Sequence, residues 1–495
     1  MANRSFPLKP IGAVFTPIPW AKWLLEQTRF LHHWTQGATI CDPTAGNGSF
    51  IYALMDLALA AGIAVDDKML SRVWAMEQQP EFLREFEHGF RRKYKRSFPR
   101  ANLLAFDVVL ANPKHRFDFL VGNPPWANFC DLPISCKAAL KRFFLEHGLV
   151  REKRALLLGG ARIDLAALII TMVLELNLHA NGQAAFFLPL SLFLGEGAHA
   201  GFRAHKLLVS EFRTCEIWDF QRENIFTGIR TRVGAARFQR DRPNHFPVSY
   251  QGFSEGRWTR HYAAPIGEPT APLCISKERT ELTRLANAPL VRVRPEQKPR
   301  QGVNTCGANR VFIFDEFPDH LPSEFVFPLL TKECFRESGC APRKFILLPY
   351  DARTGNPLTE TEIKGHPALF SYLSFHQHAL RSRKGALLGS WLKRGMWWAC
   401  LGVGSYSFAL HKVVWESYGG RSFGPQVFST FEGKPWQPNQ AMHTFIPCST
   451  QREAGLLLKR LVASPIDRYL KSLRAEGTPN WAQPGRIKRF LRFMD

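Results

Sequence analysis

Apolar residues over the first 240 positions follow two patterns, helical spacing and short continuous runs, separated by turns rich in Gly and Pro. Helical spacing predicts helices over residues 20–31, 50–61, 81–94 and 164–178. Short apolar runs predict strands over residues 39–41, 72–76, 102–106, 117–121, 183–188, 212–218 and 233–238. Because strands and helices alternate, we expect a doubly wound α/β sheet with parallel pairing through right-handed crossovers.

Two regions depart from this alternation. Residues 127–160 are predicted to be rich in loops, and residues 241–300 are rich in Pro, Gly, Arg and short aromatic runs. We therefore place a boundary near 245–270, with a first domain over 1–245 and a linker and second domain over 246–495. The second domain mixes short strands with helical segments near 360–384 and 451–474, the latter broken or kinked at Pro465. It is predicted to be mixed α/β, without a predicted topology.

Four polar side chains fall at the ends of consecutive predicted strands: Asp42, Glu77, Asp107 and Asn123. In open α/β sheets, ligands bind beyond the carboxyl ends of the strands, where strand order reverses. We therefore expect these side chains to converge on one ligand site.

A glycine-rich turn, DPTAGNGSF over residues 42–50, follows the first of these strands. Gly46 and Gly48 let the backbone pass close to a ligand in conformations that a β-carbon forbids. The G-x-G-x-x-G spacing typical of diphosphate binding is absent, which favours a ligand without a diphosphate. A purely structural tight turn explains such a segment equally well.

The acids at the next two strand ends have plausible ligand chemistry. Glu77 can accept both hydroxyls of a ribose, and Asp107 can accept from an adenine exocyclic amine. Each acid, taken alone, is better explained by a solvated or structural carboxylate, so the ligand interpretation depends on their convergence.

The segment Asn123-Pro124-Pro125-Trp126 indicates which reaction the site could catalyse. The exocyclic nitrogen of adenine is a poor nucleophile, because its lone pair is delocalised into the ring. The Asn123 side-chain carbonyl and the Pro124 backbone carbonyl can accept its hydrogens, and those bonds strengthen as the nitrogen becomes tetrahedral. Pro125 fixes the turn, and Trp126 offers a flat face to an extruded base. The alternative is a Pro-Pro turn with an ordinary core tryptophan.

Composition narrows the choice of partner. The formal net charge is +23, and both halves of the chain are basic, which favours a polyanion. Ten cysteines are scattered without the spacing of a metal or redox pair, so we expect free thiols, no metal and a cytoplasmic protein. No leader peptide is expected, and the apolar run 163–178 carries two acids and is too short for a membrane span, so no membrane partner is expected.

These motifs together resemble the N6-adenine DNA methyltransferases of bacterial restriction–modification and phage-defence systems, in the gamma arrangement. The resemblance implies a Rossmann-like S-adenosylmethionine-dependent methyltransferase sheet followed by a mixed α/β target-recognition domain. Val14-Phe15-Thr16-Pro17 resembles the family's leading motif, which contacts the methionine part of the cofactor. The residues that the resemblance assigns to S-adenosyl-L-methionine are Phe15, Thr16, Pro17, Asp42, Thr44, Gly46, Gly48, Phe50, Glu77 and Asp107.

On the catalytic side, NPPW is similar to the family's NPP-aromatic signature, which implies catalytic roles for Asn123, Pro124, Pro125 and Trp126. Segments 164–168 and 181–189 resemble the helix and strand that follow in the family. Asn224-Ile225-Phe226-Thr227-Gly228 resembles the segment whose aromatic residue covers the second face of a flipped base. The resemblance implies that Phe226 pairs with Trp126 as a sandwich, with a core phenylalanine as the alternative. Arg230 is assigned no role.

The second half resembles the family's recognition domains more loosely, at residues 302–305, 347–351 and 456–473. Cations alternate with tryptophans near residues 381–398, a pattern that suits contact with a nucleic-acid backbone and bases. The candidate DNA contacts are Arg381, Arg383, Lys384, Lys393 and Arg394. A core with a charged rim is the alternative for this segment.

The expected function is a site-specific DNA adenine-N6 methyltransferase that acts on double-stranded DNA. No endonuclease domain is expected, so a nuclease or helicase would be a separate subunit. Two alternatives remain: methylation of RNA bases or of a protein glutamine amide, and a DNA-recognition or signalling subunit of a defence complex with little turnover.

Overall fold

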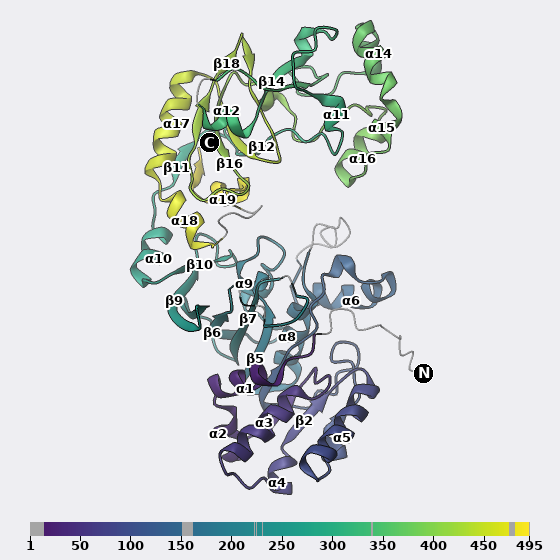
Figure 1. The fold of residues 1–495 in the computed structure, drawn as a ribbon. Helices are drawn as coiled ribbons and strands as arrows, with labels where there is room; N and C mark the ends of the chain where they lie inside the picture. Colours follow the sequence, from purple (N-terminus) through teal and green to yellow (C-terminus); the bar gives the residue numbers. More distant parts are fainter. Residues whose placement is uncertain are drawn as a thin grey trace. The chain divides into compact units, whose positions relative to one another are not determined.

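The computed structural model describes residues 14–150, 162–221, 223, 225–229, 231–337, 340–474 and 481–494. The chain forms two compact units, of which the first runs to Ala286 and the second begins at Asn287 (Figure 1). The helices in the described ranges include none long and apolar enough to cross a membrane. No cluster of three or more His, Cys, Asp or Glu side chains in those ranges is arranged to hold a metal ion.

A ten-stranded sheet in the order β10-β9-β8-β6-β7-β5-β4-β1-β2-β3 forms the centre of the first unit. Its strands are β1 Ile40–Asp42, β2 Val73–Met76, β3 Leu103–Leu104, β4 Phe117–Gly122, β5 Leu178–Pro189, β6 Phe212–Asp219, β7 Val233–Arg240, β8 Val248–Ser254, β9 Arg257–Pro265 and β10 Leu273–Ser276. The helices are α1 Ile18–Gln27, α2 Phe30–Thr35, α3 Ser49–Ala60, α4 Asp67–Leu70, α5 Pro80–Tyr94, α6 Ile134–Glu146, α8 Leu165–Leu176, α9 Ser191–Leu194 and α10 Arg279–Ala286.

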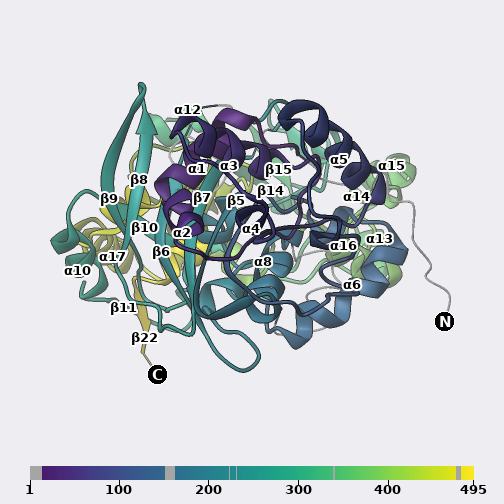
Figure 2. The same cartoon turned by 90° about the horizontal axis from the view of Figure 1, so that it is seen from below.

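Helices cover both faces of this sheet, as the alternation of strands and helices predicts. Successive side chains of β5 enter opposite cores: Phe186 packs in the core that includes α6 and α8, and Phe187 in the core that includes α1 and α3. Figure 2 shows α1 and α3 on one side of the strands and α8 and α6 on the other. The predicted α/β fold class is therefore confirmed.

Pairing within the sheet corrects the expectation of parallel strands throughout. Strands β3, β2, β1, β4 and β5 pair in parallel. Strand β7 is inserted between β5 and β6 and is antiparallel to both. The short connection from β6 to β7 contains no crossover helix among its described residues, which fits antiparallel pairing.

The expected boundary at residue 245 also differs from the structure. Strand β8 adds to β6, and β9 and β10 follow it as antiparallel neighbours, so the sheet continues through Ser276. The first unit consequently ends at Ala286. These strands were not predicted because no helix separates them, so the alternation of strands and helices stops after β7. A second difference is α6, which lies in the segment predicted to be rich in loops.

The second unit contains two four-stranded sheets, β12-β21-β16-β17 and β13-β15-β14-β20, and the pairs β11-β22 and β18-β19. Its strands are β11 Val291–Val293, β12 Arg300–Gln301, β13 Ile313–Phe314, β14 Val326–Leu330, β15 Phe345–Leu347, β16 His411–Glu416, β17 Gln426–Phe428, β18 Thr430–Phe431, β19 Lys434–Pro435, β20 Gln437–Pro438, β21 His443–Cys448 and β22 Leu491–Phe493. Its helices are α11 Asn309–Phe312, α12 Lys332–Arg336, α13 Glu360–Lys364, α14 Pro367–Phe375, α15 Gln377–Arg381, α16 Ala386–Lys393, α17 Gln451–Ala463, α18 Ile466–Ser472 and α19 Pro484–Lys488. The helical segment predicted near 451–474 is broken at Pro465, which is the N-cap of α18.

Candidate active site

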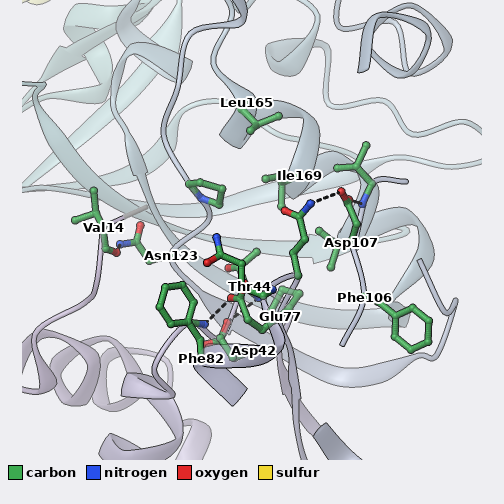
Figure 3. A pocket seen from close by; sticks show the side chains of 18 of the residues that line it. Val14, Asp42, Thr44, Glu77, Phe82, Phe106, Asp107, Asn123, Leu165 and Ile169 are labelled. Carbon is green, nitrogen blue, oxygen red and sulfur yellow. Dashed lines mark hydrogen bonds between the residues drawn. The ribbon is translucent and has the colours of Figure 1, made fainter. Parts of the chain in front are cut away.

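One pocket lies beyond the carboxyl ends of the parallel strands, and all four strand-end residues line it (Figure 3). Asp42 ends β1, Glu77 follows β2, and Asn123 follows β4. Asp107 lies three residues after β3, because that strand is shorter than the sequence predicts. The convergence predicted from sequence is thus present in the structure.

The glycine-rich turn forms one wall of this pocket. Gly46 and Gly48 have φ values of +52° and +81°, in the left-handed region that favours glycine. The turn packs closely on α5 at Gly48. A β-carbon there would lie 2.1 Å from a ring carbon of Phe86, so any side chain would clash. Thr44 Oγ1 is buried and has no hydrogen-bond partner among the described residues. The turn therefore contains a buried hydroxyl that no described residue satisfies.

The two carboxylates beside this turn are held by backbone groups. Glu77 Oε2 accepts from the N–H of Gly46 at 2.8 Å, and Oε1 accepts from Gln79 at 3.0 Å. Burial raises the pKa of Glu77, and these N–H groups oppose the rise. Burial raises the pKa of Asp42 to about 8, while the N–H of Thr44 lowers it.

Asp107 is positioned by a different set of contacts. Its Oδ1 accepts from the N–H groups of Val109 and Leu110, at 2.8 and 3.0 Å. Its Oδ2 accepts from the side-chain amide of Gln78 at 3.1 Å. A ligand amine that reached this oxygen would share it with Gln78 or displace that side chain.

Asn123 is oriented by the leading motif. Its Nδ2 donates to the backbone carbonyl of Val14 at 3.0 Å, and its Oδ1 is buried without a partner among the described residues. The amide carbonyl is therefore the unused end of this side chain (Figure 3). A buried acceptor without a donor costs free energy, which a ligand N–H would recover.

Only some of the other predicted site residues line the pocket. Phe15, Thr16, Thr44, Gly46, Phe50 and Pro125 line the pocket, while Pro17, Gly48, Pro124, Trp126 and Phe226 do not. Pro17 is the N-cap of α1. Phe15 is 47% exposed and packs edge-to-face against Phe82, with 5.3 Å between ring centroids.

Trp126 and Phe226 do not form the expected sandwich. Their ring centroids lie 5.4 Å apart, but the ring planes are perpendicular, at 87°. Phe226 is only 1% exposed and also packs edge-to-face against Phe187. No base fits between rings in direct contact, so a flipped base would require Trp126 and Phe226 to separate. Asn224 and Arg230 lie outside the described residues.

Several residues that line the pocket were not predicted from the sequence. Phe82, from the first turn of α5, and Phe106 line it with Gln78. An apolar wall comes from α6, from α8 and from a leucine two residues before α6; it is formed by Leu132, Cys136, Ala139, Leu140, Leu165 and Ile169. Apolar spacing at Cys136, Leu140 and Phe144 was the signal that would have revealed α6.

The candidate DNA contacts in the second unit separate into two kinds. Arg381, Lys384, Lys393 and Arg394 are exposed at or near the ends of α15 and α16. The guanidinium groups of Arg381 and Arg394 lie over the rings of Trp397 and Trp391, at 5.7 and 5.3 Å.

Arg383 requires a correction. It is 8% exposed, and it donates to the carbonyl oxygens of Leu380, Thr305 and Trp397. These bonds join three segments of the second unit from inside, so Arg383 is a core residue rather than a surface contact.

Comparison with known proteins establishes similarity of fold. No protein-family model matches the chain, and no curated protein matches its sequence. The Type IIL restriction–modification enzyme MmeI, solved in complex with DNA, is similar with a TM-score of 0.54 and 13% identity, over 94% of this chain and 64% of MmeI. The DrdV–DNA complex has a TM-score of 0.48 and 11% identity, over 97% of this chain and 56% of DrdV. The chain thus spans less than two thirds of either protein.

Proposed function

We propose that the protein is an S-adenosyl-L-methionine-dependent methyltransferase that acts on the N6 amino group of adenine in double-stranded DNA. The observation that carries this proposal is Asn123, which lines the pocket and whose buried Oδ1 has no hydrogen-bond partner among the described residues. Because Nδ2 is engaged with Val14, the free end of the amide accepts hydrogen bonds and does not donate them. It is therefore suited to a substrate with an N–H group.

Two hydrogen-bond acceptors of the NPPW turn would activate the target amino group for methyl transfer. Asn123 Oδ1 and the backbone carbonyl of Pro124 would each accept one hydrogen of the target amino group. As that nitrogen becomes tetrahedral, its hydrogens become more acidic and both bonds strengthen. Stabilisation is thus greater in the transition state than in the ground state, which is the condition for raising the rate.

The polar groups of the pocket support the proposed cofactor. Thr44 Oγ1 is a buried hydroxyl without a partner among the described residues. Glu77 and Asp107 would hold the ribose hydroxyls and the adenine amine, and Phe82 and Phe106 offer aromatic faces. S-adenosyl-L-methionine, when bound, supplies an electrophilic methyl group.

DNA as the carrier of the target amine is supported by charge and by fold. The net charge of +23 favours a polyanion, and exposed cations lie beside tryptophans at the ends of α15 and α16. MmeI, whose fold is similar, was solved in complex with DNA. We propose a restriction–modification or phage-defence role, in which nuclease or helicase subunits are separate partners.

The test is transfer of a tritiated methyl group from the cofactor to matched amounts of duplex DNA, structured RNA and a glutamine-containing protein extract. The proposal predicts label in DNA alone. Preferential labelling of RNA or protein would identify a different substrate for the same site. Tight DNA binding without label in any substrate would favour a recognition subunit and overturn the proposal.

A further inference from the structure

Asp219, the last residue of β6, has a fully buried carboxylate that binds backbone, guanidinium and hydroxyl groups. Its Oδ1 accepts from the backbone N–H of Gln221 at 2.8 Å and from Nε of Arg232 at 3.1 Å. Its Oδ2 accepts from Nη2 of Arg232 at 2.5 Å and from the hydroxyl of Tyr250, on β8, at 2.6 Å. Arg232 therefore holds both oxygens of the carboxylate, in the bidentate arrangement that makes charge-assisted hydrogen bonds strong and directional.

These bonds join the two ends of the segment between β6 and β7, residues 220–232. Gln221 is the second residue of this segment, and Arg232 is the last one before β7 begins. The backbone joins the same two ends, because the N–H of Phe220 donates to the carbonyl of Val233 at 3.2 Å. The buried carboxylate thus closes the segment at its base.

Phe226 lies in this segment and packs on the NPPW turn. Its ring is edge-to-face with Trp126 and with Phe187, at 5.4 and 5.3 Å between ring centroids. Its backbone carbonyl accepts from the N–H of Ile229 at 3.3 Å, so the ring is carried on a turn of the segment. The position of Phe226 against Trp126 consequently depends on how the two ends of the segment are held.

We infer that Asp219 is a positioning residue, which holds the ends of segment 220–232 together and thereby sets where Phe226 lies relative to Trp126. Its effect on methyl transfer rests on the proposed function. A flipped base that contacts both rings needs a defined separation between them, and a loosely held segment would not provide one. Asp219 acts through Phe226 rather than on the substrate itself.

Stability alone does not account for an ion pair at this place. Well-packed apolar side chains of similar volume often stabilise a fold as much as a buried ion pair does. Apolar contacts are not directional, whereas the bidentate pair fixes the angle as well as the distance between Asp219 and Arg232. Tyr250 adds a further fixed point, because its hydroxyl reaches the same carboxylate from β8.

The experiment compares Asp219→Asn and Tyr250→Phe with wild type in the full chain. Asparagine removes the charge and one acceptor oxygen, whereas phenylalanine removes only the hydroxyl and keeps the ring. Tyr250→Phe therefore decides the matter if Asp219→Asn does not fold. The matched control is Asp118→Asn, which changes a carboxylate that joins β4 to Thr39, at the opposite end of the strands.

Amide hydrogen exchange at Ile229, divided by exchange at Phe186 in the central strand β5, measures how firmly the turn at Phe226 is held. The ratio separates local opening of the segment from a general loss of stability. We expect it to rise about 3- to 10-fold in Asp219→Asn, about 2- to 3-fold in Tyr250→Phe, and less than about 1.5-fold in the control. An unchanged ratio in both variants, or an equal rise in the control, would overturn the inference.

Methyl transfer then tests whether Asp219 acts through Phe226. In single-turnover assays we expect Tyr250→Phe to slow methylation of duplex DNA by about 3- to 10-fold, with cofactor affinity within about threefold of wild type. The same change in a Phe226→Leu background should have no further effect, because the ring that is positioned is gone. Additive effects would overturn the inference. If wild type methylates nothing, the proposed function fails, while the exchange ratio still tests the role of Asp219.

Discussion

The side-chain nitrogen of Asn123 donates to the backbone carbonyl oxygen of Val14 at 3.0 Å, across 109 positions of the sequence. An amide has one donating end and one accepting end, so this bond determines which end remains for a ligand. The leading motif consequently has a second role besides lining the pocket, because it orients the side chain that we propose to be catalytic.

The Asn123→Asp variant tests whether the hydrogen bond from the Asn123 side chain to Val14 is needed in addition to the accepting oxygen. The variant keeps an accepting oxygen but replaces the donor to Val14 with a second oxygen, which repels the Val14 carbonyl. We expect methyl transfer to fall by about 100-fold or more, as when one preorganised transition-state contact is lost. Single-turnover rates measure this loss, and cofactor affinity within a few-fold of wild type shows that the pocket is intact. A rate near that of wild type would mean that the Val14 bond does not matter for catalysis.

Gly48→Ala tests the packing of the glycine-rich turn. The added β-carbon would lie 2.1 Å from the Phe86 ring, at a position with φ +81°. We expect a loss of about 2–4 kcal/mol in the free energy of unfolding, measured by urea denaturation. Gly62→Ala is the matched control, because Gly62 has φ +69° but the added carbon has no atom within 4 Å among the described residues beyond its chain neighbours. It should cost about 1 kcal/mol, and equal losses in both variants would refute the packing argument.

Asp42 should make stability depend on pH. Burial raises the pKa of Asp42 to about 8 in the folded chain, whereas the unfolded value is about 4. Between these values the unfolded chain releases a proton that the folded chain retains, so the contribution of Asp42 is fully present below about pH 4 and is lost as pH rises to about 8. Unfolding free energies measured over this range should fall less steeply with pH in Asp42→Asn than in wild type. Parallel curves would contradict the raised pKa.

The sequence predicted those parts of the fold and the site that depend only on residues close together in the chain. The motif Asp42–Phe50 and the strand-end residues Glu77 and Asn123 depend on the turn after each strand, so they were found without tertiary information. Strands β8–β10 were not predicted because no helix separates them, so the alternation of strands and helices that marked the earlier strands stops there. The pairing of β8 with β6 is a long-range contact. The burial of Arg383 could not be predicted either. Its guanidinium group donates to the backbone carbonyls of Thr305 and Trp397, which are 78 and 14 residues away, and a backbone acceptor leaves no mark in the sequence.

Arg383 and Arg381 should give opposite results when each is changed to alanine. Removing the buried Arg383 leaves carbonyl acceptors unpaired, so we expect a loss of about 3 kcal/mol in unfolding free energy. Arg381→Ala should alter stability by less than about 0.5 kcal/mol, because this side chain is exposed. If Arg381 contacts a phosphate, its removal lowers the salt dependence of DNA affinity by about one unit of slope. An unchanged slope would exclude Arg381 from the DNA interface.

We propose that Asn123 activates an adenine amino group in DNA. Its most direct test is mass spectrometry of the nucleosides released from duplex DNA after incubation with cofactor and either wild type or Asn123→Ala. We expect N6-methyladenine from wild type and about 100-fold less or none from the variant. Methylation of cytosine, or N6-methyladenine at the wild-type rate from Asn123→Ala, would contradict it.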